Sequence, residues 1–185
     1  MLEFNKQLHE YRYSGVKIPS VTQIISDVGL SNFGGVNKRM MQIAQERGTF
    51  VHLACELYDK GQLDEATVDV ELLGYLEAWK AFCNDFKPKF IEIEKKYYSE
   101  LGFAGTIDRL AVIGKDSTLI DIKTGGKSQA HEVQSGAYSI FVNPLSSLTV
   151  YLSKDGKYKV EPQNIERGKA VFLYSLEIYK YKHRG

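Results

Sequence analysis

The stretches Gly105-Thr106-Ile107-Asp108 and Leu119-Ile120-Asp121-Ile122-Lys123 place two carboxylates and a lysine inside runs that are otherwise apolar. In an extended strand successive side chains point to opposite faces, so Asp121 and Lys123 share one face about 6.6 Å apart, and the isoleucines face the other way. Burying a charge costs on the order of several kcal/mol unless the charge is paired or binds a metal. The pattern therefore indicates a cation site, with a structural ion pair as the alternative.

The tripeptide Asp-x-Lys is a weak signal by itself, because it starts at Asp85, Asp121 and Asp155. The first instance falls at a predicted helix end and the last in a predicted hairpin turn. Only the middle one lies in an apolar strand with a second carboxylate upstream. Its context, rather than the tripeptide, carries the interpretation.

The sequence around these stretches predicts a sheet flanked by helices. Apolar and polar residues alternate with period two through residues 90–98, and further strands are expected at 102–112 and 118–123. Helical spacing predicts a helix from Asn37 to about Tyr58, a second one ending before Pro88, and others at 129–141 and 166–181. The second helix has an expected buried stripe of Leu72, Leu73, Leu76, Trp79, Phe82, Cys83 and Phe86, and the last carries Val171, Tyr174, Ile178 and Tyr181 on one face.

Smaller elements complete the prediction. Hairpins are expected at 8–18, around Ser14-Gly15, and at 148–160, around Asp155-Gly156. Ser20 and Gln23 fit a capping box for a short helix that Gly29 closes. The predicted fold class is α/β, with a central mixed β-sheet flanked by helices. We expect one domain over 1–185, with a hairpin and short helix in 1–35 and a core in 36–185.

Composition excludes several classes of protein. The chain has 185 residues, is 43% hydrophobic, and contains no apolar run long enough to span a membrane. Its N-terminus lacks the pattern of a signal peptide and it has two cysteines, so we expect a cytoplasmic protein. The net charge is +1, yet residues 153–185 carry eight bases against four acids, which allows a local basic surface.

Two helices carry polar residues that point to the same chemistry. Gly48, His52 and Glu56 recur at every fourth position and form one stripe, in which glycine leaves room for a backbone or phosphate to approach. A helical histidine alone is more often a solvated or core residue than a ligand. Gln134 and Tyr138 form a similar pair, which either holds a substrate backbone or merely hydrogen-bonds to its neighbours.

Taken in order, these motifs resemble a known family. Gly48-x-x-x-His52, Gly105-x-x-Asp108, Asp121-x-Lys123 and Gln134-x-x-x-Tyr138 resemble the PD-(D/E)xK nuclease superfamily, specifically its RecB-like exonuclease branch. The segments 19–25 and 150–158 look like those of phage and prophage members. The resemblance implies a restriction-endonuclease-like core, in which a helix packs beside a β-meander and another helix precedes the last core strand.

The resemblance also implies roles for individual residues. Asp108, Asp121 and the Ile122 carbonyl would bind a Mg²⁺ or Mn²⁺ ion, which His52 would approach from its helix. Lys123 would orient or activate the attacking water. Glu56 and Glu94 would be further ligands or would support the ligands. Gln134, Tyr138 and Gly48 would contact the substrate.

The implied activity is metal-dependent hydrolysis of DNA by an exonuclease in phage or host recombination and repair, with recombination or replication proteins as partners. No membrane partner is expected, and the oligomeric state stays open. Two cysteines cannot hold the iron–sulfur cluster of some relatives, and no ATP-binding loop is present. The alternative is a nucleic-acid-binding or assembly module that has kept this scaffold without catalysis.

Overall fold

The computed structural model describes residues 1–5, 8–31 and 37–184. Its centre is a five-stranded sheet of β4 (Lys89–Ser99), β5 (Phe103–Ile113), β6 (Asp116–Lys123), β7 (Ser146–Leu152) and β8 (Tyr158–Pro162), in that spatial order. The first three strands form an antiparallel meander. β7 is parallel to β6, and β8 returns antiparallel to β7.

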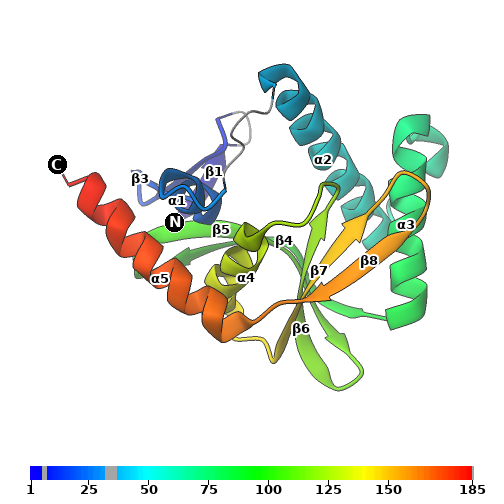
Figure 1. The fold of residues 1–185 in the computed structure, drawn as a ribbon. Helices are drawn as coiled ribbons and strands as arrows, with labels where there is room; N and C mark the ends of the chain where they lie inside the picture. Colours follow the sequence, from blue (N-terminus) through cyan, green and yellow to red (C-terminus); the bar gives the residue numbers. More distant parts are fainter. Residues whose placement is uncertain (6–7, 32–36, 185) are drawn as a thin grey trace.

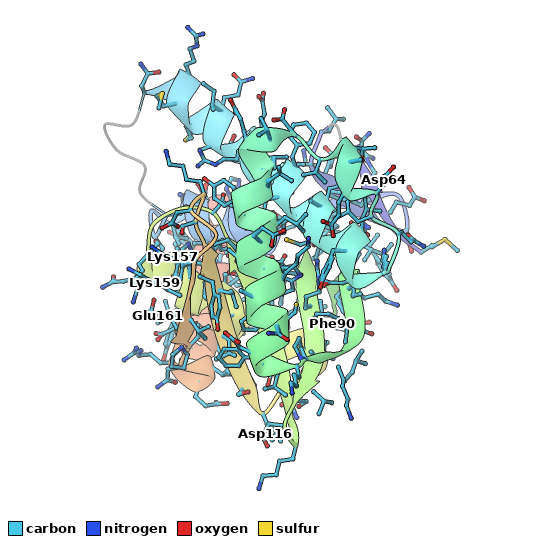
Figure 2. The ribbon with its side chains drawn as sticks, turned by 90° about the vertical axis from the view of Figure 1, so that its right-hand side faces the viewer. Asp64, Phe90, Asp116, Lys157, Lys159 and Glu161 are labelled. Carbon is cyan, nitrogen blue, oxygen red and sulfur yellow. The ribbon has the colours of Figure 1, made fainter. Side chains whose placement is uncertain are left out.

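Helices cover both faces of this sheet (Figure 1). α2 (Lys38–Asp59) and α3 (Val70–Phe86), separated by the short 3₁₀ helix η1 (Glu65–Thr67), lie on one face. α1 (Val21–Asp27), α4 (Gln129–Val142) and α5 (Ile165–Lys182) lie on the other, and α4 makes the crossover that lets β7 run parallel to β6. Figure 2 looks onto α3, with Phe90 of β4 to one side and Asp116 at the start of β6.

This arrangement confirms the predicted α/β class with a central mixed sheet. The meander, the crossover helix and the following strand also match the core that the family resemblance implied. The predicted boundary between 1–35 and 36–185 lies outside the described residues. Among those that are described, no helix is long and apolar enough to cross a bilayer.

Local signals produced the predicted helix starts. Ser20 accepts a hydrogen bond from the backbone N–H of Gln23, whose side chain accepts one from the backbone N–H of Ser20, which completes the capping box of α1. Asn37 and Ser128 cap α2 and α4 through their side-chain oxygens.

A second, smaller sheet lies at the N-terminus. The predicted hairpin is present as β2 (Glu10–Tyr13) and β3 (Val16–Ile18), and β1 (Leu2–Asn5), which sequence analysis missed, pairs with β2. Tyr11 of β2 is buried and its hydroxyl lies 2.6 Å from the hydroxyl oxygen of Thr106 on β5. This contact ties the small sheet to the central one.

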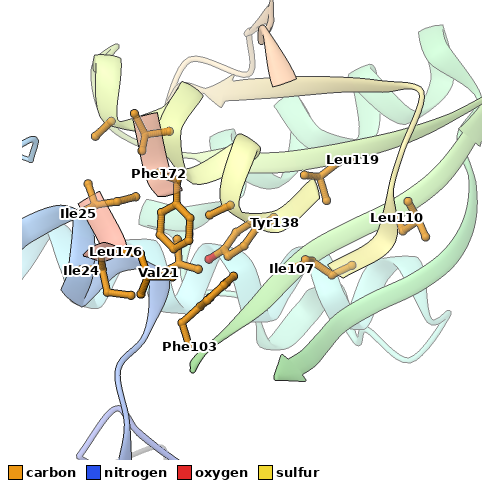
Figure 3. Close-up of a cluster of buried hydrophobic side chains, with 13 residues drawn as sticks. Val21, Ile24, Ile25, Phe103, Ile107, Leu110, Leu119, Tyr138, Phe172 and Leu176 are labelled. Carbon is orange, nitrogen blue, oxygen red and sulfur yellow. The ribbon is translucent and has the colours of Figure 1, made fainter. Parts of the chain in front are cut away.

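Each face of the central sheet has its own apolar core. The face under α1, α4 and α5 is drawn in Figure 3, where Phe103, Ile107, Tyr138 and Phe172 meet. The other face packs Ile120 and Ile122 of β6 against Trp79 and Phe82 of α3. The isoleucines that alternate with Asp121 and Lys123 therefore serve one core, while the polar pair lies on the opposite face of β6.

Two predicted apolar stripes need correction. Leu73 of α3 is 36% exposed rather than buried. On α5 the face carrying Tyr174, Ile178 and Tyr181 points to solvent, with exposures of 74%, 52% and 68%. The buried side of α5 consists instead of Gly168, Phe172, Ser175 and Leu176.

The close approach of α4 and α5 explains this choice of face. A Cβ atom at Gly136 of α4 would lie 2.0 Å from the backbone N of Lys169, and one at Gly168 of α5 would lie 2.1 Å from the backbone O of Glu132. Only glycine fits at these two positions, so the helices pack backbone to backbone. The small residues, rather than the tyrosines, determine which side of α5 is buried.

Gly136→Ala is expected to lower the free energy of unfolding by about 3 kcal/mol, because overpacking a tight contact forces the backbones apart. Urea denaturation measures this change. Gly125→Ala is the matched control, since a Cβ there meets no atom of the described residues within 4 Å. An equal free energy of unfolding in the two variants would show that α4 and α5 can move apart without loss of stability.

Candidate metal-binding site

The candidate site lies where β5 and β6 separate. Their pairing runs from Ile113 and Asp116, which flank a two-residue turn, to Arg109 and Ile120. Beyond that point the Asp108 carboxylate takes the place of a backbone partner, because its Oδ2 accepts a hydrogen bond of 2.7 Å from the backbone N–H of Ile122. Where the strands separate, the buried N–H of Ile122 would lack a backbone partner. The Asp108 carboxylate accepts from it instead, and this hydrogen bond holds Asp108 in position.

His52 of α2 meets two carboxylates at this fork. Its Nδ1 atom lies 3.6 Å from Oε1 of Glu94 and 3.6 Å from Oδ1 of Asp108. Its Nε2 atom lies 3.0 Å from the carbonyl oxygen of Ile122, which can only accept, so Nε2 carries the proton. The lone pair of Nδ1 in the neutral ring is then directed at the carboxylates.

His52, Glu94 and Asp108 together offer three ligand atoms that lie within 4.8 Å of one another. Burial by itself would lower the pKa of His52, but the charges of Asp108 and Glu94 outweigh it and raise the pKa above its ordinary value. The site therefore attracts positive charge. Two carboxylate oxygens and an imidazole nitrogen suit a hard divalent cation such as Mg²⁺ or Mn²⁺.

Glu94 reaches this group through an irregular strand. Ile93 pairs with Arg109 and Lys95 with Ile107, so Glu94 lies across from Asp108, with a register shift between Phe90 and Glu92. Its φ angle is +48°, in the left-handed region that non-glycine residues rarely adopt. Glu94 lies inside a strand rather than in a turn or at a helix cap, and strain at such a position is one of the features that cluster at functional sites.

Asp121 and Lys123 form the second part of the site. Oδ1 of Asp121 lies 2.7 Å from the ammonium nitrogen of Lys123, whereas Oδ2 is buried without a hydrogen-bond donor among the described residues. Burial raises the pKa of Asp121, opposed by Lys123 and reinforced by the charge of Asp108. A buried carboxylate oxygen without a donor is costly, and a cation would satisfy it.

Lys123 carries a proton in this environment. Burial would lower its pKa, but Asp121 and Asp108 raise the pKa above the usual value for lysine. Its ammonium donates a hydrogen bond to Asp121.

The other predicted residues line the same cleft, which has a volume of about 610 Å³. The Gln134 amide donates to the Tyr138 hydroxyl at 3.0 Å, and the Tyr138 ring packs into the core shown in Figure 3. A Cβ at Gly105 would lie 2.8 Å from that ring, so this glycine makes room for Tyr138. The wall of α2 includes Gly48 and Glu56.

Among the predicted acids, Glu56 and Asp121 lie outside the group of three formed by His52, Glu94 and Asp108. Glu56 has a partner of its own. Its carboxylate lies 2.6 Å from the ammonium of Lys60, one turn further along α2. The Ile122 side chain likewise belongs to the core, and only its backbone faces the site.

A buried ion pair that was not predicted from the sequence lies behind the site. The guanidinium of Arg109, with no exposed surface, donates to Oδ2 of Asp59 at 2.6 Å, to Oε1 of Glu94 at 2.9 Å and to the carbonyl of Asp108 at 2.7 Å. The Trp79 indole donates to the other oxygen of Asp59 at 2.8 Å. A charged residue directly after Asp108 in an apolar strand was the available signal.

The cleft also has a wall that sequence analysis did not foresee. Phe4, His9 and Tyr11 of the N-terminal segment line it, together with Lys96 of β4. The small sheet thus contributes to the candidate site.

No family model matches this chain, and a search of curated proteins found no match. Among solved structures, the chain is similar to the one described as the crystal structure of SSO0001, with 17% identity, a TM-score of 0.37, and coverage of 68% of this chain and 73% of that one. It is also similar to LHK-Exo in complex with dAMP, with 15% identity, a TM-score of 0.41, and coverage of 90% and 92%. Both TM-scores lie below 0.5, so functional assignment rests on the residues of the cleft.

Proposed function

We propose that this chain is a divalent-metal-dependent nuclease that hydrolyses phosphodiester bonds in DNA. The observation that carries the proposal is the convergence of His52, Glu94 and Asp108, whose ligand atoms lie within 4.8 Å of one another. The charge of Asp108 also acts on Asp121, whose Oδ2 is buried without a donor among the described residues. The carboxylates of Glu94 and Asp108, both directed at one imidazole, repel each other, and a divalent cation between them would offset that repulsion.

In this proposal Asp108, Glu94, Asp121 and Nδ1 of His52 hold a Mg²⁺ or Mn²⁺ ion. The Ile122 carbonyl accepts from His52 and thereby orients the imidazole. When bound, the ion supplies an acidified water and polarises the phosphoryl oxygens. The remaining chemistry falls to side chains of the chain itself.

Lys123 would orient or activate the attacking water and stabilise charge on the phosphate oxygens. Its pairing with Asp121 holds the ammonium beside the site. Gln134 and the Tyr138 hydroxyl present polar groups on the wall of α4, where they would contact the sugar-phosphate backbone. The absence of a side chain at Gly48 leaves space on the wall of α2 for the same backbone.

The choice of DNA and of exonucleolytic cleavage rests on the family resemblance, as do a role in recombination and repair and partners from those pathways. Incubation with end-labelled linear DNA and closed circular DNA, with Mg²⁺ or Mn²⁺, tests these choices. An exonuclease degrades only the linear substrate. Cleavage of the circle would indicate an endonuclease.

Calorimetric titration with Mn²⁺ tests the metal site independently of catalysis. The proposal requires saturable binding, and a rise in the thermal midpoint that follows ligand concentration. Binding of Mn²⁺ without cleavage of either DNA would favour the non-catalytic binding module. No binding at all would leave a structural ion-pair cluster.

A further inference from the structure

The aromatic wall of the cleft has no part in the metal chemistry. It is formed by Phe4 of β1, His9, and Tyr11 of β2. The centroid of the Phe4 ring lies 4.5 Å from that of Tyr11 and 5.3 Å from that of His9. The Lys96 ammonium lies 5.7 Å from the Phe4 centroid, which places a cation at the edge of the aromatic group.

The three rings differ in exposure, so the buried ring serves packing and the two less buried rings are free to contact a ligand. Tyr11 is only 3% exposed and anchors the wall through Thr106. Phe4 is half-buried and His9 is exposed, so both retain surface that faces the cleft. If the rings served only to attach the small sheet to the central one, burying Phe4 and His9 as well would add stability.

The backbone at His9 supports the same conclusion. Its φ angle is +47°, in the left-handed region, and its side chain lines the cleft. Glu94, in the candidate metal site, is the other cleft residue held in this unfavourable conformation. Sparsely populated backbone states persist where the surrounding structure enforces them, commonly at binding sites.

The aromatic wall lies close to the acids. Tyr11 contacts Thr106, two residues before Asp108 on β5, and Lys96 pairs with Thr106 across the sheet. Burial raises the pKa of Tyr11, and the charges of Glu94 and Asp108 add to that rise. When one part of a ligand is bound at the candidate metal site, the adjoining part of the same ligand would therefore lie against the rings of the aromatic wall.

We propose that Phe4 and His9, held in place by the buried Tyr11 and flanked by Lys96, form a stacking subsite that receives an unpaired nucleobase of the strand being cut. The inference rests on the proposed nuclease function and narrows its substrate to a strand whose terminal bases are free. Stacking needs a base whose face is accessible, which a paired and stacked base does not offer. A cleft of about 610 Å³ has the size of a site for one small ligand rather than for a duplex.

The test is equilibrium binding of a single-stranded oligonucleotide with phosphorothioate linkages, which resist hydrolysis, in the presence of Mn²⁺. An otherwise identical oligonucleotide carries several abasic residues at each end. Wild-type protein is expected to bind the base-bearing strand about 10-fold more tightly, in line with the usual contribution of base–aromatic stacking. Phe4→Leu, which keeps an apolar side chain but removes the ring, should bring the two affinities close together.

Phe4→Tyr should keep the preference for bases, because it retains a ring. Tyr174→Leu should keep it too, because Tyr174 lies on the exposed face of α5 and outside the cleft lining. If Phe4→Leu proves poorly folded by circular dichroism, His9→Ala tests the same subsite at an exposed position. Equal binding of both oligonucleotides by wild-type protein, or an undiminished preference in the ring-deleted variants, overturns the inference.

The outcome can be separated from that of the nuclease proposal. A preference for bases that depends on Phe4, in a protein that cleaves no DNA, would retain the stacking subsite and reject the nuclease. Metal-dependent cleavage by a protein that shows no preference for bases would retain the nuclease proposal and reject the stacking subsite.

Discussion

Asp108→Asn should remove metal-dependent DNA cleavage, with a loss of at least about 100-fold, because even residues that only support metal ligands account for 10- to 100-fold in affinity or activity. The substitution keeps the shape of the side chain, so the asparagine oxygen can still accept from the backbone N–H of Ile122. What disappears is the charge that faces Nδ1 of His52. Cleavage rates on labelled linear DNA and calorimetry with Mn²⁺ measure the effect.

The fold should survive this change. Without metal, the thermal midpoint of Asp108→Asn is expected to be no lower than that of the wild type, since repulsion with neighbouring carboxylates is relieved. Asp116→Asn is the matched control, because Asp116 is exposed at the turn where β6 begins. Full cleavage by Asp108→Asn would reject the assignment of this residue as a ligand.

Arg109→Leu should cause the largest loss of stability, about 3–5 kcal/mol in the free energy of unfolding. The side chains of Arg109 and Asp59 have no exposed surface, so removing the guanidinium leaves a buried carboxylate without its partner. Glu94 loses a hydrogen bond as well, which should weaken Mn²⁺ binding. Urea denaturation and Mn²⁺ titration measure the two effects.

Arg167→Leu supplies the comparison. Arg167 also forms a two-pronged pair with a carboxylate, that of Glu132, but its side chain is 68% exposed. Exposed pairs typically contribute less than about 1 kcal/mol. Similar losses of unfolding free energy in the two variants would mean that the buried Arg109 pair contributes no more stability than the exposed Arg167 pair.

Signals that act within a few residues were readable in the sequence. The capping box of Ser20 and Gln23 and the caps at Asn37 and Ser128 depend only on near neighbours. The period-two pattern likewise predicted β4 to β6. Asp108 and Asp121 stood out because charges interrupt apolar strands, and the structure brings the Asp108 carboxylate to the backbone beside Asp121.

Features that depend on distant contacts were not readable. Arg109 and Asp59 are fifty residues apart, and nothing local pairs them. Glu94 was named only through the family resemblance, because its position at the site depends on a register shift and a left-handed backbone that the alternating pattern conceals. On α5, apolar spacing favoured the tyrosines, whereas contact with α4 selected the side that carries Gly168.

The hairpin turn between β5 and β6 is a surface feature about 20 Å along the strand from Asp108. Only Gly114 and Lys115 separate the paired residues Ile113 and Asp116. Surface turns usually tolerate insertions. Here an added residue that slipped the pairing by one position would carry Asp108 away from the Ile122 amide and reverse the faces of Asp121 and Lys123. The length of this remote turn is therefore a constraint on the candidate metal site, and calorimetry is expected to show weaker Mn²⁺ binding by variants that lengthen it, even when they fold.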